Sequence, residues 1–239
     1  MNSILHRFSK QRRVSKTLID IAIGARAKWS AYRKIKNEAS LEEIQDIWIK
    51  YHKHSAFLNY DERSYYLLNI LKPHIKKDYK ILELGSGTGR NLHHLISSDY
   101  KNVFGIEISP KAIALMKKNY SEVLNVWNDS IECKIKNFKN GEFDIVFSML
   151  VLMHIHRDSE WIFDEIVRIT KRYLITIEEE ATGGKGRKHL PRNFKNIFEP
   201  LGMIQIEEDV YPQLNDRQFI TRVFAHESEE SRHARLAPT

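Results

Sequence analysis

Apolar and polar residues follow a block pattern that predicts strands and helices in alternation from residue 80 onward. Short apolar runs fit strands, and the stretches between them carry apolar residues at three- and four-residue spacing, which is typical of helices. The run 143–150 is almost continuously apolar, as expected of a parallel strand buried on both faces. Short connections between these elements predict a doubly wound α/β sheet. The expected strands span residues 80–84, 102–107, 123–127, 143–150, 173–177, 203–208 and 219–225.

Helix-start signals precede several of the periodic stretches. Ser40 and Glu43 have the spacing of a capping box, so a helix is expected directly after them. Its expected apolar face consists of Ile44, Ile47, Trp48 and Tyr51. Asp61 and Asp158 are each expected to cap a further helix, and so is Ser109, which Pro110 follows at the first helical position. Shorter helices are expected at 90–97 and 193–198.

The first forty residues differ from the rest in charge. They hold ten Lys and Arg against Asp20 and Glu38, a balance of +8, whereas the whole chain carries +7. A basic helix with one apolar stripe could lie on an anionic membrane, pack on its own domain, or act as an organelle transit peptide. The stripe consists of Val14, Leu18, Ile21, Ala25, Trp29 and Tyr32.

Composition limits the class of protein. A chain of 239 residues with 42% hydrophobic and 29% charged residues fits one globular α/β domain with added segments. One cysteine, Cys133, suits a reducing compartment. Because no apolar run approaches the roughly 20 residues that span a bilayer, we expect a cytoplasmic protein without a signal peptide. Two histidine pairs, at 52/54 and 154/156, do not complete a ligand set, so no metal is expected.

A glycine-rich turn follows the first strand of the expected sheet. Gly85, Gly87 and Gly89 allow the backbone to turn sharply and to approach a ligand closely. The dinucleotide pattern G-x-G-x-x-G requires a glycine where Arg90 stands, and the lysine of the phosphate-binding loop is absent. The turn therefore disfavours a pyrophosphate ligand.

Three carboxylates lie at or near the ends of the first three strands. Glu107 can accept two hydrogen bonds from a ribose diol, and Asp129 can accept one from an adenine amino group. Glu83 lies in an otherwise apolar strand, where a cationic amino group of a ligand would explain it. Each carboxylate alone could simply be solvated, but their order points to a ligand with ammonium, ribose and adenine groups and no phosphate.

The segments "LELGSGTG", "GIEIS", "ND" at 128–129 and "FDIVFSMLVLMHI" resemble the successive motifs of class I S-adenosylmethionine-dependent methyltransferases, over about residues 77–225. The resemblance implies a seven-stranded Rossmann-like sheet and S-adenosylmethionine as cofactor. In that family the glycine loop lies under the methionine part of the cofactor. The cofactor-binding residues that it implies are Glu83, Gly85, Ser86, Gly87, Glu107, Ile108, Asp129, Ser130 and Ser148. Glu83 departs from the aspartate of many members.

Methyl transfer from a sulfonium needs alignment and removal of the acceptor's proton. His154 is the first candidate for the base, since histidines are mostly neutral at pH 7, although a role in capping the turn is an equal alternative. His156 and Glu178 are second candidates. The segment 51–63 is expected to form a lid, as N-terminal helices do in many family members. Its expected contacts, with Glu178 as an added substrate residue, are Tyr51, Tyr60 and Arg63.

The chain lacks the (Asp/Asn)-Pro-Pro-(Tyr/Phe) box of amine methyltransferases that act on nucleic acid, and so resembles the small-molecule branch. The expected reaction is methyl transfer to an oxygen, or less readily a nitrogen, of a small molecule, sugar or lipid-linked acceptor. Basic residues of the loop after 180 are expected to dock an anionic acceptor: Lys185, Arg187, Lys188 and Arg192. An RNA methyltransferase anchored by the basic arm and an inactive binding subunit are the alternatives.

The expected organisation is a helical arm and lid at 1–76, a methyltransferase domain at 77–226 and a flexible tail at 227–239. The expected partners are a small-molecule acceptor and, by peripheral contact, an anionic membrane. Nucleic acid is not expected to be a partner. The sequence does not specify the acceptor atom or the oligomeric state.

Overall fold

The computed structural model describes residues 39–51, 53–180, 189–190, 192–212 and 218–226. The chain divides into two compact units, residues 1–39 and 40–239, and all described helices and strands belong to the second unit. The basic arm, the basic residues at 185–188 and the tail at 227–239 lie outside the described residues.

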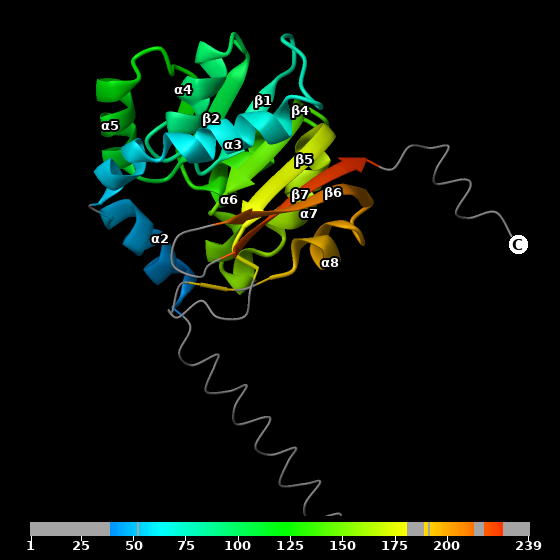
Figure 1. The fold of residues 1–239 in the computed structure, drawn as a ribbon. Helices are drawn as coiled ribbons and strands as arrows, with labels where there is room; N and C mark the ends of the chain where they lie inside the picture. Colours follow the sequence, from blue (N-terminus) through cyan, green and yellow to red (C-terminus); the bar gives the residue numbers. More distant parts are fainter. Residues whose placement is uncertain (1–38, 52, 181–188, 191, 213–217, 227–239) are drawn as a thin grey trace, which may run out of the picture. The chain divides into compact units, whose positions relative to one another are not determined.

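The second unit is built on one seven-stranded sheet (Figure 1). Its strands lie side by side in the order β3-β2-β1-β4-β5-β7-β6. The first five strands are parallel, and β7 is antiparallel to both β5 and β6. Their bounds are β1 Ile81–Leu84, β2 Val103–Glu107, β3 Val126–Asn128, β4 Phe143–Met149, β5 Thr170–Glu178, β6 Met203–Pro212 and β7 Gln218–His226.

The sequence prediction of a doubly wound, seven-stranded α/β sheet is therefore confirmed. The largest differences from the expected strands are in β3, which begins three residues later than expected, in β5, which begins three residues earlier, and in β6, which extends to Pro212. The apolar run 143–150 forms the central strand β4, whose residues are almost all buried.

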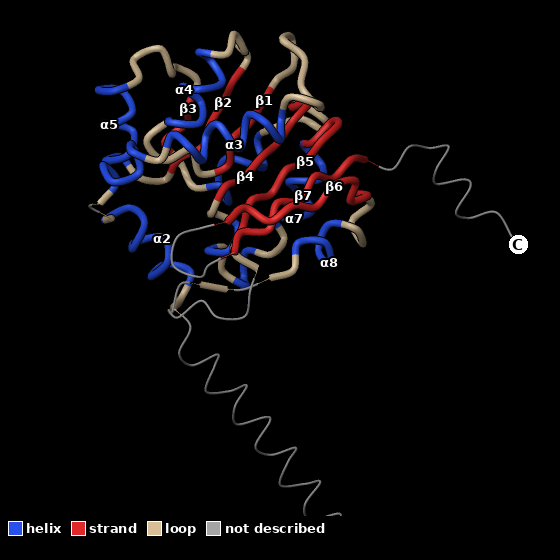
Figure 2. Tube along the Cα trace, viewed as in Figure 1, coloured by secondary structure: helices blue, strands red, loops and turns tan. Residues whose placement is uncertain are grey.

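Helices cover both faces of the sheet (Figure 2). One face packs against α3, α4 and α5, and the other against α6, α7 and α8. The helix bounds are α2 Leu41–Lys50, α3 Asp61–Leu71, α4 Arg90–Ser97, α5 Pro110–Asn119, α6 Ile131–Lys134, α7 Ile162–Ile169 and α8 Phe194–Phe198. Short 3-10 helices are η1 His54–Asn59, η2 Ile135–Asn137, η3 Leu152–His154 and η4 Arg157–Ser159.

Alternation along the strands explains the two cores. Ile81 and Ile145 point to the face with α3 and α4, whereas their neighbours Leu82 and Val146 point to the face with α6 and α7. All four are fully buried, because successive residues of a strand point to opposite faces and both faces are covered.

Helix caps were predicted correctly at two of four positions. The Ser40–Glu43 capping box is formed, and the Ser109 side chain accepts from the backbone N–H of Ala112. The predicted cap at Asp61 is wrong, since Tyr60 takes the cap position and the Asp61 carboxylate instead contacts His94 Nε2 at 3.0 Å.

The predicted cap at Asp158 is also wrong. Asp158 lies inside η4, where its own backbone N–H donates to Nδ1 of His156 at 3.1 Å. Helix α7 starts four residues later, at Ile162, and the preceding Trp161 makes no side-chain cap. A short helix that is capped by His156 thus precedes α7.

The doubly wound arrangement brings the carboxyl ends of β1, β2, β3 and β4 to the same edge of the sheet, which is where ligands bind in such sheets. Within the described part of the chain, no helix is long and apolar enough to cross a membrane.

Candidate active site

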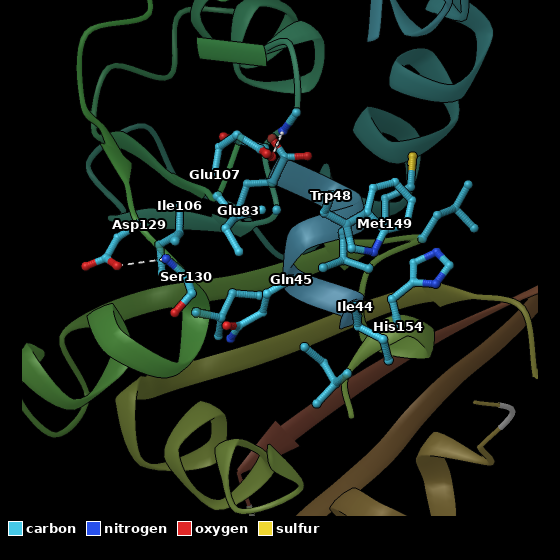
Figure 3. Close-up of a pocket in the computed structure, with 18 of the residues that line it drawn as sticks. Ile44, Gln45, Trp48, Glu83, Ile106, Glu107, Asp129, Ser130, Met149 and His154 are labelled. Atoms are coloured by element: carbon cyan, nitrogen blue, oxygen red, sulfur yellow. Dashed lines mark hydrogen bonds between the residues drawn. The ribbon is translucent and has the colours of Figure 1, made fainter. Parts of the chain in front are cut away.

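A cavity of about 210 Å³ opens at this edge of the sheet. Its walls come from the segments that follow β1, β2, β3 and β4, and from helix α2 with residues of η1 and α3 (Figure 3). Ten of the residues expected in the site line it: Glu83, Gly85, Ser86, Gly87, Glu107, Ile108, Asp129, Ser130, His154 and Arg63.

The glycine loop has the backbone geometry that its sequence indicates. Gly85, Gly87 and Gly89 have φ angles of +70°, +55° and +79°, which are strained for residues with a Cβ atom. A Cβ atom at Gly85 would lie 2.5 Å from Cγ2 of Val151, so the loop packs directly against the turn after β4. At Gly87 an added Cβ would meet no described atom within 4 Å. The loop is thus held on one side and open towards the cavity on the other.

Glu83 is buried, with 2% of its surface exposed. Its Oε1 accepts from Nδ2 of Asn91 at 2.7 Å, whereas Oε2 has no hydrogen-bond partner among the described residues. Burial raises the pKa of Glu83 to about 8, against the opposing effects of Asn91 and the Arg90 guanidinium. The hydroxyl of Ser86, which also lines the cavity, is buried and likewise has no described partner. Unsatisfied buried polar atoms are rare in folded proteins and need an explanation.

A polar network that the sequence did not predict holds Glu83 in place. Asn91 Oδ1 accepts from the Ser64 hydroxyl at 2.6 Å and from Arg90 Nη2 at 3.2 Å. Arg90 Nε donates to the Ser64 hydroxyl at 2.8 Å. The network connects α3 and α4 to the first strand. The signal in the sequence that could have revealed this network is the pair of polar residues, Arg90 and Asn91, at the start of α4.

Glu107 is held by the backbone at both carboxylate oxygens. Oε2 accepts from the N–H of Gly87 at 2.8 Å, and Oε1 accepts from the N–H of Ser109 at 2.7 Å. Burial raises the pKa of Glu107, and the two hydrogen bonds oppose that effect. Each carboxylate oxygen can accept more than one hydrogen bond, so this geometry leaves capacity for a diol.

Asp129 lies at the far end of the same wall. Its Oδ1 accepts from the N–H of Ser130 at 2.8 Å, and its own N–H donates to the carbonyl of Glu107 at 3.1 Å. Ile106, Ile108 and Ile131 line the cavity beside it. A carboxylate among apolar side chains fits a flat heterocycle with an exposed amino group.

His154 lies in the turn after β4 and is buried, with 7% of its surface exposed. Its ring centroid lies 4.6 Å from that of Trp48 and 4.8 Å from that of His189. His156 also lines the cavity, but its Nδ1 accepts from the N–H of Asp158. Both histidines therefore line the same cavity.

Ser148 and Glu178 were expected to line the cavity, but neither does. Both are fully buried, and the Ser148 hydroxyl donates to Oε1 of Glu178. The Glu178 carboxylate also accepts from the N–H groups of Val151 at 3.1 Å, Leu152 at 3.1 Å and Met153 at 3.3 Å. Burial raises the pKa of Glu178 to about 7, although these donors favour the ionised form. Glu178 therefore stabilises the turn that carries His154 and does not line the cavity.

Arg192 also differs from its expected role. It was expected to dock an anionic acceptor, yet its side chain is 5% exposed and its Nη2 donates to Glu160 at 2.9 Å and to the carbonyl of Ile155 at 2.7 Å. The guanidinium stabilises the segment after the β4 turn, because its donors are directed to protein acceptors.

The expected lid contributes only in part. Arg63 lines the cavity, and its guanidinium lies 4.1 Å from the ring centroid of Tyr60. Tyr60 and Tyr51 do not line it, and Tyr51 packs edge-on against His54 at 5.0 Å. The lining from this region comes mainly from α2, which the sequence did not place in the site: Leu41, Ile44, Gln45 and Trp48.

Among the described residues, no group of three or more His, Cys, Asp or Glu side chains could hold a metal ion. The site described above consists of carboxylates, glycines, histidines and apolar side chains.

Residues 82–173 match the family model of a methyltransferase domain. The chain is 27% identical over 133 residues to the tRNA U34 carboxymethyltransferase of Nautilia profundicola, over 50% of this chain and 43% of that protein. It is 27% identical over 77 residues to EEF1A lysine methyltransferase 4 of Mus musculus, over 32% of this chain and 30% of that protein. The matches span less than half the length of both relatives.

Solved structures share the fold at low sequence identity. Magnesium protoporphyrin IX methyltransferase from Synechocystis PCC 6803, crystallised with S-adenosylmethionine, superposes with a TM-score of 0.57 at 13% identity, over 84% of this chain and 91% of that one. The family match over residues 82–173, the order of the motifs and the fold agree on a methyltransferase of the class that uses S-adenosylmethionine.

S-adenosylmethionine is the cofactor of this class, and the residues of the cavity fit it. The unpartnered Oε2 of buried Glu83 suits an ammonium group, and the open side of Gly87 leaves room for a ligand against the backbone. Glu107 and Asp129 lie further along the same wall, in the order that ribose and adenine require.

Proposed function

We propose that this protein transfers the methyl group of S-adenosylmethionine to an oxygen atom of a small-molecule acceptor, with His154 as the base. The single observation that carries the proposal is that one cavity contains both the carboxylates suited to the cofactor and the buried imidazole of His154. An acceptor in this cavity would lie between the bound cofactor and the imidazole of His154.

The described residues have separate tasks in this reaction. When bound, S-adenosylmethionine supplies an electrophilic methyl group. Glu83 orients the amino acid part, Glu107 holds the ribose and Asp129 meets the adenine amino group. His154 would accept the proton of the acceptor hydroxyl as the oxygen–methyl bond forms and the methyl–sulfur bond breaks, which would leave S-adenosylhomocysteine.

His156 is less suited to act as the base. Nδ1 of His156 already accepts from a backbone N–H, so the proton of the neutral ring is on Nε2, and neither nitrogen is available to take another from a substrate. His154 lies on the wall formed by the β4 turn, which also packs on the glycine loop through Val151.

The curated relatives include enzymes named for tRNA and for a protein, so the class of acceptor is a proposal. The absence of an (Asp/Asn)-Pro-Pro-(Tyr/Phe) box supports a small molecule over nucleic acid. A role as an inactive binding subunit is the alternative that retains the same cofactor contacts.

The test is a methyl-transfer assay with the full-length protein, methyl-labelled S-adenosylmethionine and a cell lysate separated into RNA, protein and small molecules. We expect label in the small-molecule fraction. His154→Ala should lower the rate by about 10²–10⁴ without weakening cofactor binding. His93→Ala is the matched control, because His93 stacks on Tyr120 away from the cavity and its loss should leave the rate unchanged.

Label in RNA would instead favour the RNA methyltransferase alternative. Cofactor binding without label in any fraction would favour the inactive subunit. Normal turnover in His154→Ala would reduce that residue to a structural role.

A further inference from the structure

Helix α2 presents one stripe of side chains to the cavity, and a single carboxamide interrupts it. The stripe runs at spacings of three and four residues: Leu41, Ile44, Gln45 and Trp48. The charged side chains of the same helix are exposed and do not line the cavity: Glu42, Glu43, Asp46 and Lys50. An amphipathic helix normally turns apolar residues to its covered face, so the amide of Gln45 needs an explanation.

The Gln45 side chain makes no hydrogen bond to any described residue, although it is partly buried in the cavity wall. Its amide offers an acceptor oxygen and an NH₂ donor. A ligand that fills the cavity displaces the water around these groups, and leaving them unpaired then costs free energy. The ligand beside Gln45 is therefore expected to carry both a donor and an acceptor.

The direction of the side chain shows which part of the cavity it serves. Figure 3 shows the Gln45 amide pointing from α2 towards the wall with Asp129 and Ser130. Trp48 points the other way, and its ring lies 4.6 Å from that of His154, centroid to centroid. Helix α2 also packs against α5, the helix that follows β2. Gln45 thus belongs to the cofactor half of the cavity.

The wall opposite Gln45 meets only part of what adenine requires. Adenine donates through its amino group and accepts through its ring nitrogens. The Asp129 carboxylate can take one amino hydrogen, but the N–H of Ser130 is already bonded to Oδ1 of Asp129 at 2.8 Å. The N–H of Asp129 donates to the carbonyl of Glu107 at 3.1 Å. Both of these backbone donors are used within the wall, so a donor from the side of α2 would complete the site.

A glutamine amide is complementary to the amino edge of adenine. Its Nε2 donates and its Oε1 accepts side by side, whereas adenine places an acceptor nitrogen beside its amino donor. Glutamine pairs with adenine in this way in DNA grooves. Since the amino group has two hydrogens, it can donate to Asp129 and to Gln45 at the same time.

We propose that Gln45 is a specificity residue for the cofactor, and that its amide binds the adenine of S-adenosylmethionine through the amino group and a neighbouring ring nitrogen. A base with a carbonyl oxygen in place of the amino group would meet the acceptors of Asp129 and Gln45 without a donor. This inference rests on the proposed placement of the cofactor along the carboxylates, and it depends neither on the acceptor nor on His154.

Binding of S-adenosylhomocysteine to the full-length protein, measured by calorimetry, provides the first test. Gln45→Leu keeps the volume and the helix propensity but removes both hydrogen bonds, so we expect about tenfold weaker binding. Gln45→Glu keeps an acceptor oxygen but lacks the donor, and should also bind more weakly. Asp46→Leu is the matched control and should bind normally, because the Asp46 side chain is 53% exposed and does not line the cavity.

Two cofactor analogues separate recognition of the base from packing. The 1-deaza and 7-deaza forms of S-adenosylhomocysteine each replace one of the ring nitrogens nearest the amino group by a CH group. For one of the two, we expect the wild-type protein to bind about tenfold more weakly than it binds S-adenosylhomocysteine, and Gln45→Leu to cause little further loss. A role of Gln45 in packing alone would weaken the binding of all three ligands equally.

Equal loss for all three ligands in Gln45→Leu would overturn the inference, as would unchanged affinity for S-adenosylhomocysteine in that variant. Glu107→Ala separates this failure from failure of the proposed function. If Glu107→Ala weakens binding and Gln45→Leu does not, only the role of Gln45 is overturned. If Glu107→Ala also binds normally, the placement of the cofactor along the carboxylates is wrong.

Discussion

A single carboxylate oxygen, Oε2 of Glu83, links the sequence motif to a measurable property of the site. The rest of the residue is fixed, because Asn91 holds Oε1 and the surrounding strand is buried. Burial raises the pKa of this carboxyl to about 8, so the group is mostly protonated in the free protein below that pH. An ammonium group at Oε2 would favour the ionised form and lower that pKa.

Cofactor affinity should therefore depend on pH. Below pH 8 the free protein holds a proton on Glu83 that the complex does not, so binding releases it and tightens as pH rises. Between pH 6 and 7.5 we expect the affinity for S-adenosylhomocysteine to rise by about tenfold, since one pKa unit corresponds to about 1.4 kcal/mol. Calorimetry in buffers of different ionisation enthalpy measures both the affinity and the proton release.

The isosteric Glu83→Gln variant provides the control. It keeps the hydrogen bond with Asn91 possible but cannot ionise, so it should bind more weakly at pH 7.5 and lose the pH dependence. A wild-type affinity that does not change between pH 6 and 7.5 would show that Glu83 does not meet the cofactor's ammonium group.

At the scale of elements, the end of β5 controls the turn after β4. Leu150 has a φ of +61°, an unfavourable conformation for a residue with a branched side chain. The three residues that follow it donate their N–H groups to Glu178, and Ser148 donates its hydroxyl. Four hydrogen bonds to one buried carboxylate thus stabilise a strained turn that carries His154.

Glu178→Gln should destabilise this turn. The amide keeps one acceptor oxygen and places an NH₂ group against backbone donors, so we expect a loss of about 1–3 kcal/mol in the free energy of unfolding. Methyl transfer should fall with it, while cofactor affinity changes less. Urea denaturation and the transfer assay measure the two effects.

Glu199→Gln is the control for Glu178→Gln. Glu199 is 41% exposed at its side chain and lies 3.9 Å from Lys195, a pair that contributes little. If both variants have the same stability and activity, Glu178 does not hold the turn.

The sequence predicted the helices and strands better than it predicted the contacts between residues that lie far apart in the chain. Strand periodicity and glycine turns depend on local residues, so the sheet and the glycine loop could be predicted. The roles of Glu178 and Arg192 could not, because their partners are backbone groups about 30 residues away that only the folded turn brings together. The stripe of α2 shows the same limit: its pattern indicated an apolar face that included Ile47, but Ile47 is 38% exposed and Gln45 lines the cavity.

At the scale of the whole molecule, charge is divided between the first forty residues and the rest. The first forty residues carry +8, although the chain as a whole carries +7. We propose that the arm brings the enzyme to anionic membranes, at about 1 kcal/mol per basic residue near the surface, screened by salt.

Co-sedimentation with anionic and neutral vesicles tests the arm. The full-length protein should bind anionic vesicles in low salt only, and replacing the ten Lys and Arg of residues 1–40 by glutamine should abolish binding. Lys117→Gln with Lys118→Gln, on the exposed side of α5, is the control and should keep it. Equal binding by all three proteins would leave the arm without a membrane role.

The position of β7 has a consequence for how the protein is made. β7 is the last described strand in the sequence, yet it lies between β5 and β6 in the sheet. During synthesis β6 therefore emerges before the strand that joins it to the sheet. The 14 residues that follow Pro212, up to and including His226, take about one to three seconds to translate at typical rates. Throughout that interval the edge of β5 is unpaired, and the nascent chain is open to association with other strands.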